Sequence, residues 1–336
     1  MSSSDGRIAV DHLSKRFGAV QAVDDLSFEV LPGRVTGFLG PNGAGKTTTL
    51  RMLLGLVRPT AGTATVAGRP YADIPQPARV VGAALEAASF HPGRSARDHL
   101  RVLAPQVGVP DARCDEVLGI VGLADDAGRR VGGFSLGMRQ RLALATTLLG
   151  DPGVLVLDEP ANGLDPEGIA WLRRFLRHLA GEGRTVLVSS HVLSEVQQTV
   201  DDVVIIARGR LVHASSLGDL ARLARRTVHV SSPDGEGLRR LVAEHFAGHE
   251  DPEAVGGTGA GASGIGATAV LTGVDAAEVG AAAFAARLEL HQLTTRDVGL
   301  EDVFLQLTGE PPGAADGPAA GTPAATTAPA TERGAA

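Results

Sequence analysis

The sequence predicts an α/β protein with a mixed sheet flanked by helices, a helical subdomain, and a small α+β domain near the C-terminal end. Three observations support this class. A strand-like run leads through a glycine-rich loop at 40–48 into a helix; an apolar run at 154–157 ends in two acids; and the run 184–190 ends at a histidine. Ligands of parallel sheets lie at the C-terminal ends of the strands, so these three segments point to one site.

The loop at 40–48 matches the pattern G-x-x-x-x-G-K-[ST], which predicts that the chain binds a nucleoside triphosphate. The strand before it is expected at 34–39 and the helix after it at 47–56, the order that this motif requires. The alternative is an ordinary glycine-rich turn, to which 44 glycines in 336 residues would lend weight. We take as candidate nucleotide ligands Gly40, Asn42, Gly43, Gly45, Lys46, Thr47 and Thr48.

Each residue type in this loop suits a polyphosphate. Gly43 and Gly45 can adopt backbone angles that other residues avoid, which allows successive N–H groups to surround an anion. Lys46 supplies positive charge, and the N-terminal end of the following helix adds more. Thr47 offers a hydroxyl to Mg²⁺.

The run Val154–Pro160 reads as a buried parallel strand that delivers two carboxylates to its C-terminal end. We expect Asp158 to hold Mg²⁺ through water and Glu159 to polarise the water that attacks the γ-phosphate. Taken alone, an Asp-Glu pair is more typical of an ordinary turn at a strand end. Together with the phosphate-binding loop, it favours ATP hydrolysis over binding alone.

At this point the motifs resemble those of the ATP-binding cassette (ABC) ATPases, over about residues 8–223. The resemblance implies that Phe17 stacks on adenine, although its spacing alone is equally compatible with a core residue. It also implies that the segment 134–142 is the family signature, with Ser135 and Gly137 meeting a γ-phosphate. Asp165 matches the loop that touches the partner subunit, and His191 matches the switch histidine that contacts the γ-phosphate.

Two departures from the family pattern are visible. The signature lacks its usual first glycine and its glutamine, but Ser135 can still cap the helix that begins there. Glu86 stands where the family has a glutamine that senses Mg²⁺ and the membrane partner. A carboxylate can still ligate Mg²⁺, so Glu86 is a candidate metal ligand, with a solvated loop acid as the alternative.

The resemblance implies a mode of action. In the family, the phosphate-binding loop of one subunit works with the signature of another, so we expect an ATP-bound homodimer or a pair with another ATPase half. The departures and the segment 86–92 resemble exporters of the daunorubicin and bacitracin resistance type, whose ATPase is a separate polypeptide. We therefore expect an integral membrane permease as partner, with Phe90 and His91 facing it, and a peripheral location at the cytoplasmic face. Drug or antibiotic efflux is the implied task.

The organisation follows the motifs. We expect an ABC ATPase domain at 1–223 with a helical subdomain at about 86–150, and a small α+β domain at 224–309. Glycine-rich residues 251–267 are expected to form a flexible insert, and the Pro/Ala/Gly/Thr tail at 310–336 to be disordered. The last helix, expected at 300–307, resembles the closing helix of exporter ATPases, with a plain amphipathic helix as the alternative.

Composition excludes several classes. The formal net charge of −7 argues against a sequence-independent grip on nucleic acid, which needs a basic surface. No long uncharged apolar stretch predicts a membrane span, no secretory signal is expected, and the single Cys114 cannot form an internal disulfide. The runner-up function is a soluble ABC-type ATPase acting on DNA or ribosomes, although the chain lacks the long insertions, second cassette or basic arms of such proteins. A module that holds ATP without turnover is disfavoured by Glu159.

Overall fold

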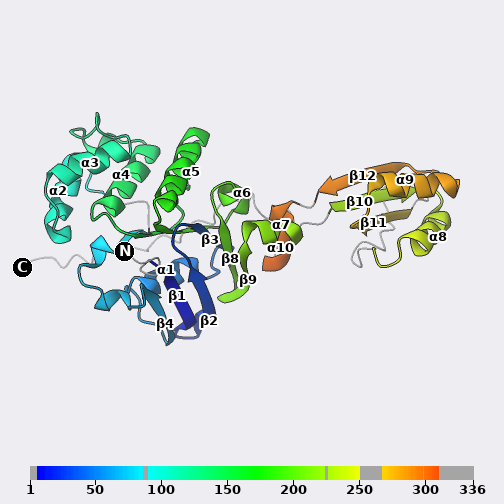
Figure 1. Ribbon diagram of the computed structural model, residues 1–336, viewed down its shortest axis with the longest axis horizontal. Coiled ribbons are helices and arrows are strands. Elements are labelled where there is room, and N and C mark those ends of the chain that lie inside the picture. Colours follow the sequence, from blue (N-terminus) through cyan, green and yellow to red (C-terminus); the bar gives the residue numbers. More distant parts are fainter. Residues whose placement is uncertain (1–5, 86–89, 224–225, 250–266, 298, 310–336) are drawn as a thin grey trace, which may run out of the picture.

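The computed structural model describes residues 6–85, 90–223, 226–249, 267–297 and 299–309. Figure 1 shows a larger part that contains strands β1–β9 and a smaller part that contains β10–β12. The expected tail at 310–336 and the expected insert at 251–267, apart from Ala267, lie outside the described residues.

A six-stranded mixed sheet forms the centre of the larger part. Its strands lie in the order β5-β6-β7-β3-β8-β9, and all neighbours are parallel except the antiparallel pair β8 and β9. The strand bounds, in the order of the sheet, are Val81–Ala84, Val154–Leu157, Thr185–Ser190, Val35–Leu39, Asp202–Ala207 and Arg210–Ser216. The mixed α/β class predicted from the sequence is confirmed.

The inner strands are apolar along their whole length because both faces of the sheet are covered. In β6, Leu155 and Leu157 face one hydrophobic cluster, while Val154 and Val156 face another. All four side chains are buried. The continuous apolar run before Asp158 therefore reflects a strand buried on both sides, as its sequence predicts.

A three-stranded antiparallel sheet of order β2-β1-β4 covers one face of the central sheet through the second cluster. Its strands are β1 Ile8–Phe17, β2 Val20–Val30 and β4 Ala61–Val66. Helix α1, Lys46–Leu53, follows β3 and contributes Leu50 to the same cluster. The helix ends earlier than the expected Leu56, because Leu54 caps it and Gly55 takes a left-handed φ of 68°.

Helices cover the other face. The first cluster joins the strands to α2 Ala96–Val107, α3 Ala112–Ile120, α4 Leu136–Leu148 and α5 Pro166–Gly181. Figure 1 shows α2, α3 and α4 side by side, with α5 next to α4. Short helices α6 Leu193–Val196 and α7 Leu217–Leu223 flank the last strands. The described residues of the larger part also form 3-10 turns at Tyr71–Asp73, Pro77–Arg79 and Val131–Gly133.

The smaller part is an antiparallel sheet of order β11-β10-β12 packed with two helices around a cluster of its own. Its elements are β10 Arg226–Ser232, α8 Gly235–His245, β11 Ala267–Thr272, α9 Ala276–Ala285 and β12 Gln292–Asp297. The alternating apolar pattern of Leu288–Leu293 predicts a strand there, but the structure has β12 later, from Gln292. Leu288 and Leu290 do pack against the cluster, but they do so from the connection after α9, where Arg287 has a φ of 55°.

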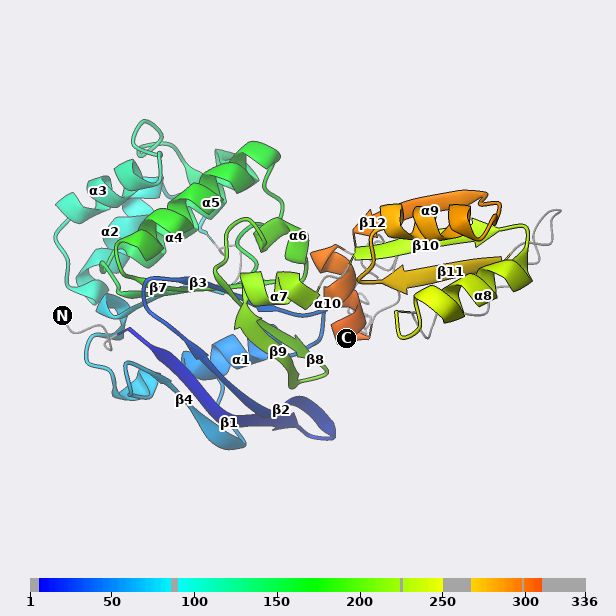
Figure 2. The same ribbon diagram turned by 45° about the vertical axis from the view of Figure 1, so that its right-hand side comes forward.

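The last described helix, α10 Leu300–Thr308, returns to the larger part. Its Val303 and Phe304 are buried in the first cluster, and the helix contacts α6, α7, β8 and β9. Figure 2 shows α10 between α7 and the smaller sheet. The range 224–309, expected to be a separate domain, therefore ends in a helix that packs in the core of the larger part. The smaller part is inserted in the chain between α7 and α10.

Candidate functional site

The glycine-rich loop lies between β3 and the start of α1, as expected. Gly43 has a φ of 80° and Gly45 a φ of 104°, both in the left-handed region that favours glycine. A Cβ at Gly45 would also lie 2.5 Å from the carbonyl oxygen of Ala22. Asn42 is exposed at the tip of the loop, and Thr48 is half-buried in the first turn of α1. The loop therefore has the backbone conformation that a phosphate-binding nest requires.

Lys46 is the buried cation of this region, with a side chain only 6% exposed. Its Nζ donates to the carbonyl oxygens of Gly40, at 2.5 Å, and Pro41, at 3.3 Å. The same nitrogen lies 3.4 Å from Oε1 of Glu159. The ammonium thus lies between the loop and the acid that follows β6, where it can neutralise negative charge from either side.

Asp158 and Glu159 follow β6 directly, as the sequence predicts. Thr47 Oγ1 in α1 donates a 2.8 Å hydrogen bond to Oδ2 of Asp158. The hydroxyl of Ser189 in β7 donates to Oδ1 of Asp158. A hydroxyl and a carboxylate side by side are hard oxygen donors, which suits Mg²⁺.

Glu159 is held at several points. Its backbone has a φ of 49°, uncommon for a residue other than glycine. Its N–H donates to Ser189 Oγ at 2.9 Å, and its Oε2 lies 2.9 Å from Nδ1 of His191. The carboxylate is 21% exposed and the imidazole 32% exposed, so solvent can reach both. The pair can accept and pass a proton from a water molecule placed beside it.

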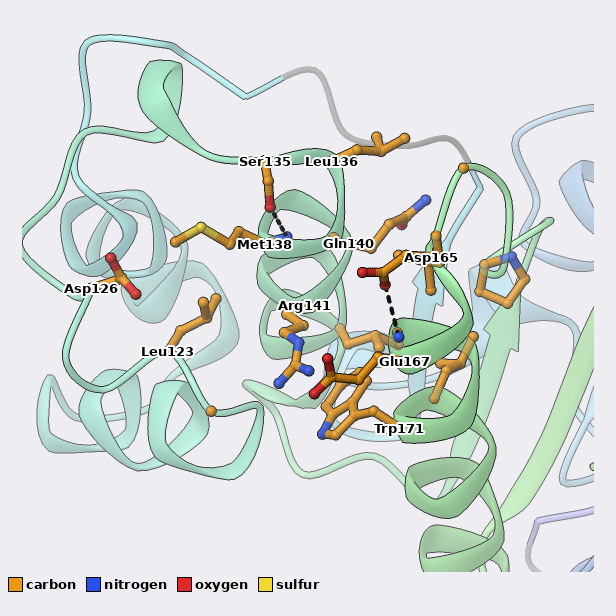
Figure 3. Close-up of a pocket in the computed structure, with 18 residues that line it drawn as sticks. Leu123, Asp126, Ser135, Leu136, Met138, Gln140, Arg141, Asp165, Glu167 and Trp171 are labelled. Carbon is orange, nitrogen blue, oxygen red and sulfur yellow. Dashed lines mark hydrogen bonds between the residues drawn. The ribbon is translucent and has the colours of Figure 1, made fainter.

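Ser135, Gly137 and Asp165 meet at a different place. Ser135 caps α4 by accepting a hydrogen bond from the N–H of Met138 at 3.2 Å, and Asp165 caps α5 by accepting one from Gly168 at 2.9 Å. All three residues line a pocket of about 470 Å³ between the helical subdomain and α5. Figure 3 shows Ser135 at the start of α4 and Asp165 at the start of α5.

Side chains that line this pocket also join α4 to α5. The Arg141 guanidinium lies 4.1 Å from the ring centroid of Trp171, whose ring stacks on Phe175 at 5.0 Å. Figure 3 shows Arg141 and Trp171 together below Asp165. Among the described residues, the loop 40–48 contributes nothing to the pocket lining. Among the described residues of one chain, this pocket is therefore lined by the signature and not by the phosphate-binding loop.

Phe17 ends β1 at the hairpin with β2 and is 50% exposed. The ammonium of Lys15 lies 4.8 Å from its ring centroid. This exposure excludes the alternative that Phe17 is a core residue. A ring with one open face can stack on a planar base.

The candidate metal ligand Glu86 lies outside the described residues. Ser189 is a residue of the site to which the sequence assigned no role, yet it contacts both acids. The available signal was a serine at the end of a buried apolar strand, two residues before His191. Sequence alone does not reveal which neighbouring strand that serine faces.

Comparison with known proteins agrees with the motifs and the fold. The ABC transporter family model matches residues 23–162. The chain is 41% identical to the bacitracin transport ATP-binding protein BcrA of Bacillus licheniformis, over 72% of this chain and 80% of the relative. It is 36% identical to the Nod factor export ATP-binding protein I of Paraburkholderia xenovorans (strain LB400), over 90% of this chain and 97% of the relative.

Solved structures give the same fold. The ATP-binding subunit of an ABC transporter aligns with a TM-score of 0.58 and 29% identity, covering 64% of this chain and 92% of that chain. The ADP conformation of an ATP-binding cassette also has a TM-score of 0.58, at 20% identity, covering 64% of this chain and 94% of that chain. At that identity the second likeness shows the fold alone.

The fold defines a nucleotide-binding ATPase of the cassette class. The chain belongs to the ABC transporter family, as an ATP-binding subunit of the exporter type, and it is an ATPase that powers transport through a membrane permease. In the part of the chain that the structure describes, no helix is both long enough and apolar enough to span a bilayer.

Proposed function

We propose that this chain binds Mg²⁺-ATP at the loop 40–48 and hydrolyses it with Glu159, in a dimer that drives a separate permease exporting antibiotics or other hydrophobic compounds. The observation that carries the proposal is the arrangement around Glu159. Its carboxylate lies within reach of Lys46 and His191, and Asp158 with Thr47 lies directly beside it.

Binding is assigned to the loop and to α1. The backbone N–H groups from Gly43 to Lys46 surround the β-phosphate, and Lys46 carries the charge that pairs with the β- and γ-phosphates. Gly40, Asn42 and Thr48 complete the loop. Phe17 stacks on the adenine from its exposed position on the β1–β2 hairpin.

Thr47 and Asp158 are the proposed Mg²⁺ ligands. The hydroxyl of Thr47 would bind the ion directly, and Asp158 would hold it through water. When bound, the ion neutralises phosphate charge and orients the γ-phosphate for attack. The two oxygens already lie 2.8 Å apart, so the chain needs little rearrangement to present them to a cation. Glu86 is a further proposed ligand that lies outside the described residues.

Glu159 is the proposed general base. It would accept the proton of the attacking water, while His191 keeps the carboxylate oriented through Nδ1. The other ring nitrogen of His191 is the group proposed to contact the γ-phosphate. Lys46 compensates the negative charge that the carboxylate brings close to ATP. This division of tasks requires a water molecule beside Glu159, and its 21% exposure leaves room for one.

Ser135, Gly137 and Asp165 are proposed to complete the site of a second subunit. They lie in a pocket to which the loop 40–48 of the same chain contributes no described residue. A symmetric pair solves this separation, because a two-fold axis lets each loop meet the other chain's signature. Closure on ATP and opening after hydrolysis then move the permease.

The proposed cargo rests on the relatives. Their names include bacitracin transport, lantibiotic transport and Nod factor export. The first two concern antibiotics, so we propose antibiotics or other hydrophobic compounds as cargo. The cargo pathway lies in the permease, and no residue of this chain is assigned to it.

Mg²⁺-dependent ATP hydrolysis by the full chain, alone and with its permease, tests the proposal. Glu159→Gln should lower kcat by about 10²- to 10⁴-fold, the usual cost of losing a general base. Glu244→Gln, an exposed acid of α8, is the matched control and should turn over like the wild type. Turnover in Glu159→Gln within about threefold of the wild type would remove Glu159 from the mechanism.

A further inference from the structure

Ser189 lies at the C-terminal end of β7, between the strand that leads to the phosphate-binding loop and the strand that delivers the acids. It pairs with Phe38 of β3, while the neighbouring Val188 pairs with Leu157 of β6. Its side chain is fully buried. A serine in this position must find hydrogen-bond partners inside the protein.

The hydroxyl of Ser189 finds its partners on two consecutive residues. It donates to Oδ1 of Asp158 and accepts the N–H of Glu159 at 2.9 Å. A hydroxyl has one proton to donate and lone pairs to accept with, so a single Oγ can satisfy both groups at once. Ser189 therefore bridges the side chain of one acid and the main chain of the other.

The conformation of Glu159 makes this bridge consequential. Its φ of 49° is a sparsely populated value that persists only when neighbours determine it. The N–H is fixed by Ser189, and the carbonyl accepts from the N–H of Asn162 at 3.1 Å. The carboxylate is held by His191 and Lys46. Ser189 is thus the contact that fixes the backbone N–H of Glu159.

His191 and Ser189 belong to the same short segment, which reaches Glu159 twice. His191 Nδ1 lies 2.9 Å from the carboxylate of Glu159. Ser189, two residues before His191, accepts the backbone N–H of the same Glu159. A movement of this segment therefore shifts both ends of Glu159 together. The neighbouring Ser190 bonds instead to the backbone of Val192 and to Glu195, so it contacts neither acid.

We propose that Ser189 is a positioning residue for ATP hydrolysis: it holds the Asp158–Glu159 peptide so that Glu159 faces the attacking water while Asp158 faces the cation with Thr47. The inference rests on the proposed function of the two acids. Ser189 touches neither nucleotide nor water in this role and acts only through its two neighbours.

The test compares three variants of the full chain. Ser189→Ala removes the bridge, and Ser189→Thr keeps a hydroxyl that can both donate and accept. Thr185→Val is the control, because Thr185 is a fully buried residue of the same strand whose hydroxyl bonds to the carbonyl of Gly6 instead. Thermal unfolding of all three shows how much each lost hydroxyl affects folding itself.

Steady-state hydrolysis separates positioning from folding. Ser189→Ala should lower kcat by about 10- to 100-fold, as expected when a reacting group is misplaced by about 1 Å, with the KM for ATP within about threefold. Ser189→Thr should recover most of kcat, and Thr185→Val should retain it even if both Ala and Val variants lose similar thermal stability. Ser189→Ala with kcat within about twofold of the wild type would overturn the inference.

A second readout needs no turnover. In titrations of a fluorescent ATP analogue, Ser189→Ala should need several-fold more Mg²⁺ to reach half of the Mg²⁺-dependent rise in affinity, because Asp158 loses a donor that orients it. An unchanged Mg²⁺ requirement would contradict the role at Asp158. Failure of the proposed function itself would instead be seen in the wild type, as the absence of Mg²⁺-dependent hydrolysis with the permease present.

Discussion

Helix α10 offers a sharp test of how the chain is divided. Phe304 is 3% exposed and lies in the cluster that also contains the central sheet and α5. Replacing a buried phenylalanine by alanine costs roughly 3–5 kcal/mol. A loss of 1 kcal/mol lowers the Tm of a domain as large as the larger part by about 2–4 °C, so Phe304→Ala should lower the Tm of the larger part by roughly 6–20 °C.

The chain contains its own reporter for this experiment. Trp171 is the single tryptophan and lies in α5, stacked on Phe175. Its fluorescence therefore follows unfolding of the ATPase part and not of the smaller sheet. Urea or thermal unfolding of Phe304→Ala, followed at this residue, measures the loss directly.

Two controls give the result its meaning. Phe284→Ala removes a ring that is 86% exposed on α9 and should leave the Trp171 transition unchanged. Leu271→Ala opens the core of the smaller sheet and should also leave it unchanged. The reasoning is refuted if Phe304→Ala does not move the Trp171 transition, or if Leu271→Ala moves it equally.

Two further predictions follow from single side chains. Lys46→Ala should weaken ATP binding by about 10- to 100-fold, the loss of one charge-assisted contact, as measured by calorimetry; unchanged affinity would place the phosphates elsewhere. Burial, and secondarily the charge of Arg94, lowers the pKa of His99, whose ring meets Phe90 edge-on. Because the pKa of His99 is lower in the folded chain, the unfolded chain binds a proton at this residue at higher pH, and the free energy of unfolding should fall as pH drops below about 6.5. His99→Gln should make this fall smaller. Urea midpoints of the wild type and the variant, compared at about pH 7.5 and 5.5, measure it. An equal slope in His99→Gln would assign the pH dependence to other groups.

The phosphate-binding loop and the acids could be predicted because each depends on residues close together in the sequence. A strand buried on both faces is apolar throughout, so Val154–Leu157 and the acids after it could be recognised without knowing their neighbours. Glycines at left-handed angles leave a similarly local signal, as Gly43 and Gly45 do.

Features that depend on distant neighbours could not be predicted. Phe17 was equally compatible with a core and an exposed position, because a strand-end aromatic carries no local mark of what covers it. The amphipathic pattern of α10 predicts a helix, but it does not indicate whether the helix packs against the larger or the smaller part. The strand after α9 was misplaced because Leu288 and Leu290 alternate like a strand while lying in a connection.

The central claim is that the loop 40–48 of one subunit works with the signature of another, and the mass of the Glu159→Gln variant in Mg²⁺-ATP tests it most directly. Sedimentation velocity should show a dimer with ATP and a monomer without it. Adding Gly137→Arg should abolish the dimer while ATP still binds. A Cβ at Gly137 lies 3.7 Å from Leu164 Cδ2, an ordinary contact, so the first side-chain atom of the new residue meets no clash within the isolated chain. A Glu159→Gln chain that binds one ATP and stays monomeric, or a double variant that still dimerises, would contradict the account.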